Sequence, residues 1–211
     1  MRANPLYRPG GTMRVLGAPV LPCVPGLWHN HALPSADAPL STMTDQPYEV
    51  VIDSPDLAAT AALGATLASC LPGGTLVALE GPLGAGKTTL VKGVAEALGI
   101  DPASVTSPTF VLMQVYEGRR PLLHVDAFRL QRPEEFAALG AEEFFPPDGL
   151  VFVEWFSKAV LKAPDLEIHI EILHATGRKF VLRTRHAPLA ERLRQALARL
   201  GARSSPVPHP R

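Results

Sequence analysis

The segment Gly81-Pro82-Leu83-Gly84-Ala85-Gly86-Lys87-Thr88 decides the fold class, because it matches the phosphate-binding pattern G-x-x-x-x-G-K-[ST] at every fixed position. The residues before it, 75–80, form a short apolar run typical of a buried strand. Residues 88–98 after it are expected to form a helix, with Gly99 at its C-terminal end. Strand, glycine loop and helix in this order predict a nucleotide-binding P-loop (Walker A). The alternative is a glycine-rich turn with an exposed lysine.

Each part of this loop has an expected task in phosphate binding. The glycines let the backbone turn so that successive N–H groups point to one anion, at the positive end of the following helix. Lys87 is predicted to reach the β- and γ-phosphates, and Thr89 to support the α-phosphate. The Thr88 hydroxyl is an oxygen ligand suited to Mg²⁺.

Length and composition favour one α/β domain without a nucleic-acid-binding surface of its own. Of the 211 residues, 46% are hydrophobic and 19% charged, which is enough apolar material for one well-buried core. Lysine plus arginine and aspartate plus glutamate each number 20, and the isoelectric point is about 7.1. This balance argues against a basic surface that holds RNA or DNA unaided, so any nucleic acid is expected to come through a partner.

Cysteine usage and hydropathy indicate a cytoplasmic protein. Cys23 and Cys70 are the only cysteines, too few for a disulfide framework and without the spacing of a metal site. No run approaches the roughly 18 apolar residues of a membrane span, and prolines interrupt the early stretch 15–28. We therefore expect a reducing cytosol, with no export signal and no membrane anchor.

The chain ends differ in character from the middle. Residues 1–43 are rich in proline and show neither helical nor strand periodicity, so we expect them to be disordered. Met43 is a candidate for the true start of translation. A single P-loop ATPase domain is predicted over 44–202, followed by a disordered tail over 203–211.

The remaining elements predict a three-layer, P-loop NTPase-like α/β sandwich with a mixed, mainly parallel central sheet and antiparallel hairpins. Asp53-Ser54-Pro55 is expected to cap the first helix, and the turns of the two hairpins are expected at 117–120 and 175–177. Further strands are expected at 48–52, 109–116, 121–126, 150–153, 166–173 and 179–185, and helices at 56–70, 133–139 and 188–200.

Two predicted strands end in carboxylates, Asp126 and Glu154. A P-loop enzyme needs an acid to hold magnesium or order a water, and ligands of open α/β sheets bind beyond the carboxyl ends of the strands. Either acid is a candidate for the magnesium ligand, although an acid at a strand end can also be merely solvated. The hydroxyl-rich stretch 106–109 either closes over the γ-phosphate or forms a plain turn.

Together these residues resemble the TsaE (YjeE) family, P-loop ATPases of bacterial tRNA threonylcarbamoyladenosine biosynthesis. The resemblance covers about residues 48–185. It depends on four motifs in order: the loop Gly81 to Thr89, T-S-P-T at Thr106 to Thr109, H-x-D-x-[YF]-R at His124 to Arg129, and V-E-W at Val153 to Trp155. Phe128 stands where the family often has tyrosine, and the proline-rich N-terminal segment lies outside the family pattern.

The resemblance implies site residues for ATP and Mg²⁺. The implied nucleotide-binding set is Gly81, Leu83, Gly84, Ala85, Gly86, Lys87, Thr88, Thr89, Thr109, Asp126 and Arg178. Thr88 and Glu154 would hold the metal, and Asp126, Lys87 and Glu154 would be catalytic.

The resemblance also implies specific roles for four residues, and some of these roles have alternatives. Thr109 would be switch-like. Arg178 would contact the nucleotide, or else be a solvated hairpin residue. His124 and Arg129 would contact partner proteins or order the site, whereas a lone histidine is commonly structural.

The implied function is an ATPase, slow alone, that drives the cycle of a transferase made of the TsaD and TsaB proteins, with tRNA bound by those partners. One rival is a P-loop small-molecule kinase, although no arginine-rich lid segment is visible. Another is an ATP-dependent switch module without significant turnover. Guanine specificity is disfavoured because no [NT]-K-x-D motif is present.

Overall fold

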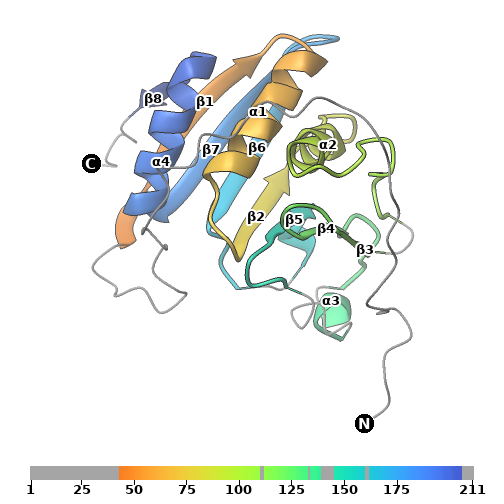
Figure 1. Ribbon diagram of the computed structural model, residues 1–211. Helices are drawn as coiled ribbons and strands as arrows, with labels where there is room; N and C mark the ends of the chain where they lie inside the picture. The colour runs from red at the N-terminus through yellow and green to blue at the C-terminus, as the bar shows by residue number, and fades with distance from the viewer. Residues whose placement is uncertain (1–42, 110–111, 133, 139–144, 160–161, 206–211) are drawn as a thin grey trace. The chain divides into compact units, whose positions relative to one another are not determined.

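Eight strands form one sheet in the computed structural model, in the order β3-β4-β5-β2-β6-β7-β1-β8 (Figure 1). The structure describes residues 43–109, 112–132, 134–138, 145–159 and 162–205, all within one compact unit. The strands are β1 Met43–Ser54, β2 Thr75–Glu80, β3 Met113–Tyr116, β4 Leu122–Asp126, β5 Leu150–Glu154, β6 Leu166–Ile172, β7 Arg178–His186 and β8 Arg203–Ser205. The helices are α1 Leu57–Cys70, α2 Lys87–Ala97, α3 Glu134–Ala138 and α4 Ala187–Leu197, with 3₁₀ turns at Phe156–Lys158 and Ala198–Leu200.

The parallel part of the sheet is confined to its centre. Strands β4, β5, β2 and β6 run parallel, whereas β3 on one side and β7, β1 and β8 on the other are antiparallel to their neighbours. The α/β class with a mixed sheet and two hairpins is confirmed, but four of the seven pairings are antiparallel, so the expected mainly parallel sheet was wrong in its balance. The reason is geometric, because short turns such as 117–120 can join only antiparallel strands.

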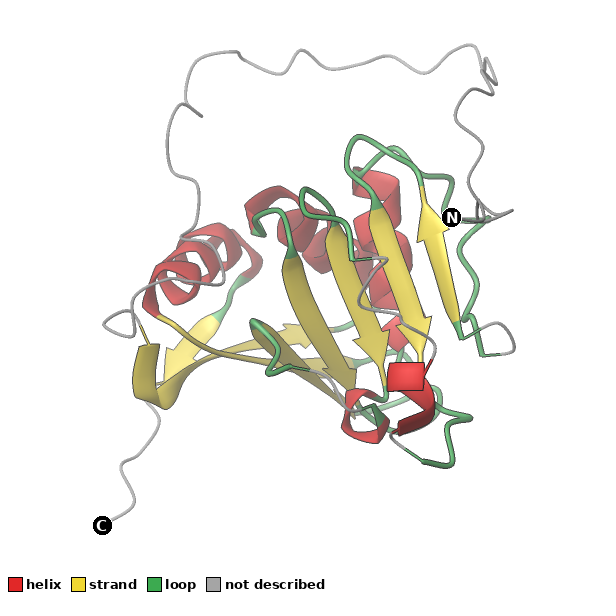
Figure 2. Cartoon of the chain, turned by 90° about the horizontal axis from the view of Figure 1, so that it is seen from below, coloured by secondary structure: helices red, strands yellow, loops and turns green. Residues whose placement is uncertain are grey.

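Helices cover the two faces of the sheet unequally (Figure 2). Helices α1, α2 and α4 cover one face, where α2 lies over β5 and α4 over β1 and β7, and their leucines join one core with the inward side chains of the sheet. The opposite face is smaller: Phe136 of α3 packs there against Leu123, Val125, Val151 and Val153 from β4 and β5. Because strand side chains alternate between faces, the residues of β4 and β5 divide between the two cores.

Two glycines let α1 and α2 pack backbone against backbone. A Cβ on Gly64 of α1 would lie 2.7 Å from the backbone nitrogen of Val94, and one on Gly93 of α2 would lie 2.9 Å from Cα of Ala61. Such distances leave no room for a methyl group. The contact therefore fixes α2, and with it the P-loop, against α1.

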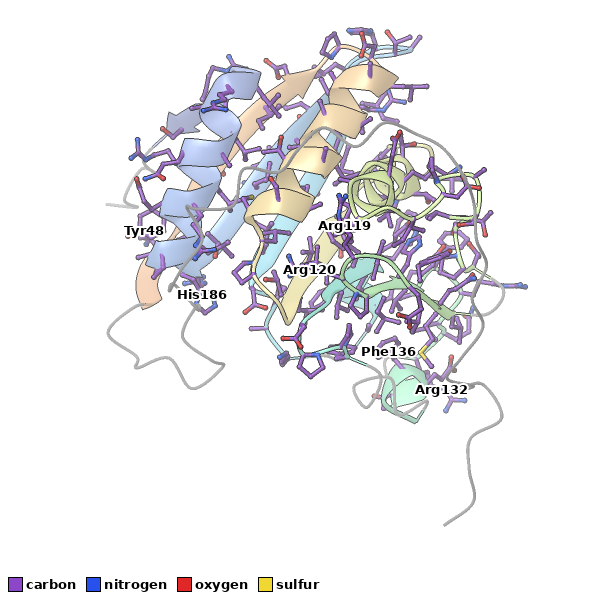
Figure 3. The ribbon with its side chains drawn as sticks, in the orientation of Figure 1. Tyr48, Arg119, Arg120, Arg132, Phe136 and His186 are labelled. Atoms are coloured by element: carbon purple, nitrogen blue, oxygen red, sulfur yellow. The ribbon has the colours of Figure 1, made fainter. Side chains whose placement is uncertain are left out.

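Two arginines in the turn between β3 and β4, labelled in Figure 3, bind the ends of the neighbouring helices. Arg119 donates to the carbonyl of Ala97 at the end of α2. Arg120 donates from Nη1 to the carbonyl of Leu71, at the end of α1, over 2.8 Å, and from Nε to that of Asp148 over 3.0 Å. The turn of the β3–β4 hairpin is thereby fixed to both helices.

Several predicted boundaries were wrong. The first helix is capped by Asp56, whose side chain accepts from the Ala59 amide over 2.8 Å, because Asp53 and Ser54 still pair with β7. The strand expected over 109–116 is limited to β3, since Leu112 turns the chain with φ 67°.

The predicted chain ends also need correction. Met43 begins β1, and Arg203–Ser205 forms β8, which pairs with β1, so these residues do not belong to disordered ends. The predicted disorder of residues 1–42 and 206–211 lies outside the described residues, as do Pro133 and Leu139 at the ends of the predicted helix 133–139. Among the described helices, none has the length and apolar character needed to span a membrane.

The substitution Gly64→Ala tests the helix contact. At an exposed helical position the change would stabilise by roughly 1 kcal/mol, because alanine is the better helix former. Here the methyl group would lie 2.7 Å from the Val94 nitrogen. We therefore expect a loss of about 1–3 kcal/mol in the free energy of unfolding, measured with urea. Ala65→Ser, exposed on the same helix, should change it by less than about 0.5 kcal/mol. A stability equal to or above that of the unchanged chain would contradict the close packing.

Candidate nucleotide-binding site

The loop between β2 and α2 turns back sharply onto the first turn of the helix. Gly81 has φ 146°, and a Cβ there would lie 2.6 Å from the carbonyl oxygen of Ile170 on β6. Gly86 has φ 100° and stands directly before α2. Both positions therefore require glycine. The turn leaves the first N–H groups of an 11-residue helix next to the loop, an arrangement that binds anions.

Lys87, the first residue of α2, is buried inside this loop. Its Nζ donates to the carbonyls of Gly81 over 2.8 Å and of Pro82 over 3.1 Å. The ammonium also lies 3.8 Å from the centre of the Trp155 ring. Burial lowers the pKa of Lys87, while the negative charges of Glu154, Asp126 and Glu80 oppose that shift. A bound polyphosphate would give this buried cation a further counter-charge.

Glu154 connects the loop helix to the sheet. It is the last residue of β5 and is 3% exposed, so its carboxylate needs donors. Two donors reach the same oxygen: Thr88 Oγ1 lies 2.7 Å and His124 Nε2 2.9 Å from Glu154 Oε1. Thr88 comes from the first turn of α2, and His124 from β4. Helix and strands therefore meet at one carboxylate.

Asp126 lies beside Glu154, because the two residues are paired in register at the ends of the parallel strands β4 and β5. It is 2% exposed. Its Oδ2 accepts from Thr109 Oγ1 over 2.6 Å and from the Ser107 hydroxyl, and its Oδ1 accepts from the Phe128 amide over 2.9 Å. The 106–109 stretch thus binds Asp126 directly, and Ser107 is a partner that the sequence had not singled out.

Arg178 lies against the P-loop backbone. Its Nε donates to the carbonyl of Ala85 over 3.0 Å, and its Nη2 to that of Gly84 over 3.2 Å. Its Nη1 binds carbonyls of its own hairpin, including His174 at 3.0 Å. Since the peptide unit is planar and trans, the Gly86 N–H points away from the carbonyl that Arg178 holds. The arginine thus orients the loop and is not merely solvated.

Trp155 is the site residue whose role sequence reasoning missed. It has φ 58°, an uncommon conformation for a bulky residue, and its amide donates to the Leu79 carbonyl over 2.9 Å. Its ring faces Lys87 and lies 5.1 Å from the ring of Phe128. The V-E-W motif gave the only sequence signal, because no pattern predicts a left-handed tryptophan.

The other predicted site residues surround this centre. Thr89 is half-buried in the first turn of α2, Leu83 is 78% exposed at the tip of the loop, and Arg129 is exposed after β4. Among the described residues, no group of three or more histidine, cysteine, aspartate or glutamate side chains is arranged to hold a metal. A cation here would rely on Thr88 and Glu154 oxygens together with ligand oxygens and water, a coordination typical of Mg²⁺.

The chain resembles a set of known proteins. The family model of threonylcarbamoyl adenosine biosynthesis protein TsaE matches residues 54–180. The tRNA threonylcarbamoyladenosine biosynthesis protein TsaE of Treponema pallidum is 40% identical over 113 residues, 54% of this chain and 83% of that protein. The Aquifex aeolicus protein of the same name is 36% identical over 133 residues, 62% and 92% of the two chains. The crystal structure of Bacillus subtilis YdiB aligns with a TM-score of 0.60 and 27% identity, over 74% of this chain and 99% of that one.

Replacing Arg178 tests whether it orients the loop. In Arg178→Ala the Gly84 and Ala85 carbonyls lose their shared donor, so amide hydrogen exchange over 84–87 is expected to rise at least tenfold without any ligand. Affinity for Mg-ATP should fall about 10–100-fold, because two charge-assisted hydrogen bonds that orient the loop are lost.

Lys179→Ala is the matched control, since this neighbouring cation pairs at the surface with the exposed Glu171 at 3.2 Å. It should change neither measurement. If Arg178→Ala weakens nucleotide binding but leaves exchange of the ligand-free loop as it was, the arginine contacts the nucleotide instead of positioning the loop.

Proposed function

Because the chain belongs to the TsaE family of threonylcarbamoyl adenosine biosynthesis proteins, we propose that it serves tRNA threonylcarbamoyladenosine modification by binding and hydrolysing ATP at the P-loop site. The family membership inferred from four sequence motifs is confirmed. The nucleotide, its hydrolysis and the partners are the finer part of the proposal, and the site geometry supports them.

One observation carries the ATPase proposal: a buried lysine, a threonine hydroxyl and two buried carboxylates converge at the N-terminus of one helix. Thr88 lies 2.7 Å from Glu154, and Asp126 is its neighbour across the β4–β5 pair. Lys87 is in the electrostatic field of both acids. An ordinary glycine turn would have no reason to bury such a set, because unpaired buried charges are costly.

The residues at this point fit Mg²⁺. The Thr88 hydroxyl has oxygen lone pairs besides the proton it donates to Glu154, so it can contact a cation while keeping that hydrogen bond. Glu154 adds a carboxylate. When bound, the ion would neutralise charge that develops on the phosphates. Lys87 would leave its loop carbonyls for the phosphate oxygens.

Asp126 is the residue proposed to orient the attacking water. Its carboxylate is held by Ser107, Thr109 and the Phe128 amide, so its direction is fixed. Phosphoryl transfer is catalysed mainly by positioning and electrostatics, which this rigid acid can supply. Thr109 is proposed to sense the γ-phosphate, and its hydrogen bond to the same acid supports this role.

The proposed partners are the TsaD and TsaB proteins, which would carry out the transfer and hold the tRNA. The equal numbers of basic and acidic residues support this division, since the chain has no excess of cations for RNA. In this proposal ATP hydrolysis drives the partners' cycle, and the chain does not transfer the threonylcarbamoyl group.

Two substitutions test the assignment of roles. Lys87→Ala should weaken Mg-ATP binding about 10–100-fold, because the triphosphate loses its buried cation. Glu154→Ala should leave nucleotide affinity without magnesium nearly unchanged while turnover falls by at least tenfold. Calorimetry and phosphate release measure the two effects. Glu167→Ala, an exposed acid on β6, is the control and should behave like the parent chain. Full hydrolysis in Glu154→Ala would remove Glu154 from the metal site.

Stimulation by partners tests the biological role. We expect phosphate release to be slow for the chain alone and to rise at least tenfold with TsaD and TsaB, because hydrolysis is proposed to be coupled to their cycle. The Lys87→Ala chain with the same partners gives the background. A rate that the partners do not change would favour a switch module, and consumption of a phosphate acceptor would favour a kinase.

A further inference from the structure

His124 is a polar residue inside an apolar row of the sheet. Along β4, Leu122, His124 and Asp126 share the face that α2 covers, and Phe152 is the register partner of His124 on β5. The histidine is 0% exposed. Packing alone would be served better by an apolar side chain, because a buried imidazole loses its hydration. A histidine buried at this position therefore calls for a specific polar contact.

The ring makes one hydrogen bond. Nε2 lies 2.9 Å from Glu154 Oε1, and Nδ1 is buried without a partner among the described residues. A carboxylate only accepts, so the Nε2–H must donate. This tautomer leaves Nδ1 as a bare acceptor. Among the described residues, Glu154 is therefore the one hydrogen-bond partner that orients the His124 ring.

We propose that His124 is a positioning residue for the magnesium ligand: its Nε2–H holds Glu154 Oε1 and leaves Oε2 for the metal ion or a metal-bound water. This inference rests on the proposed function, since it assigns a role in the same site. Glu154 Oε1 already has two donors, Thr88 and His124, whereas no described residue donates to its Oε2.

The two donors to Glu154 Oε1 belong to different elements of the fold. Thr88 belongs to the loop helix and would share its hydroxyl with the cation, so its geometry changes when ligand binds. His124 is fixed within β4, between β3 and β5. A glutamate side chain has three torsions and therefore several conformations. A donor on a rigid strand favours one of these conformations, both with and without bound ligand. Such outer partners of a metal ligand are worth about 10–100-fold in metal affinity.

The experiment uses three substitutions in the full chain. His124→Gln places an amide N–H near the position of Nε2, His124→Asn carries the same amide too far from Glu154, and His124→Leu removes the donor. Binding of a fluorescent N-methylanthraniloyl derivative of ATP is measured in EDTA and then with increasing MgCl₂. The first titration reports the fold and the loop, and the second reports the metal site.

We expect all folded variants to bind the nucleotide in EDTA with the parent affinity. The magnesium concentration that gives half of the maximal change in nucleotide binding should rise about 10–100-fold in His124→Leu and His124→Asn. It should stay within about threefold of the parent value in His124→Gln. Should His124→Leu not fold, the contrast between Gln and Asn decides. Equal magnesium dependence in all folded variants, or a Gln variant as poor as Asn, overturns the positioning role. Absence of any magnesium effect in the parent chain instead defeats the proposed function.

Discussion

The buried carboxylate of Glu154 is the constraint that the rest of the structure depends on. A carboxylate that is 3% exposed must find donors inside the protein, and it finds them on two different elements, Thr88 of α2 and His124 of β4. These bonds set the start of α2 over the ends of β4 and β5. The backbone contact between Gly64 and Val94 holds the same helix from its other side. Loop, helix and sheet are thus oriented by a few short contacts that tolerate little change.

The charges at this point are unequal, and the imbalance has a chemical meaning. Lys87 brings one positive formal charge, whereas Asp126 and Glu154 bring two negative ones. Alone, this arrangement would repel a polyphosphate, and the attraction of Lys87 to Trp155 and to two loop carbonyls shows that the cation is already engaged. Binding of a divalent cation would change the sign of the local net charge from negative to positive. In the proposed function, the site would therefore bind a nucleotide together with its metal, and Thr88 and Glu154 offer oxygen atoms for that ion.

Fixed patterns made the centre of the site predictable from sequence, whereas tertiary contacts decided the remainder. The loop pattern located Lys87 and Thr88, and the rule that parallel strands end at one edge brought Asp126 and Glu154 together. Ser107 on Asp126, Arg178 on the loop carbonyls and the left-handed Trp155 depend on contacts between distant segments. The same holds for β8, a three-residue strand of Arg and Ser that exists because β1 has an edge to pair with.

The hydrogen bonds of Asp126 offer a physical route by which a partner would act on the proposed ATPase. A carboxylate offers about four acceptor positions, and here three of them are taken by Ser107, Thr109 and the Phe128 amide. An acid held so firmly is well oriented but has little capacity left for a water, so in the proposed ATPase turnover by the isolated chain would be slow. A partner that draws the 106–109 stretch away from Asp126 would free Oδ2 without moving β4. Stimulation would then come from releasing an acid that the fold already holds in place, with no new catalytic group supplied.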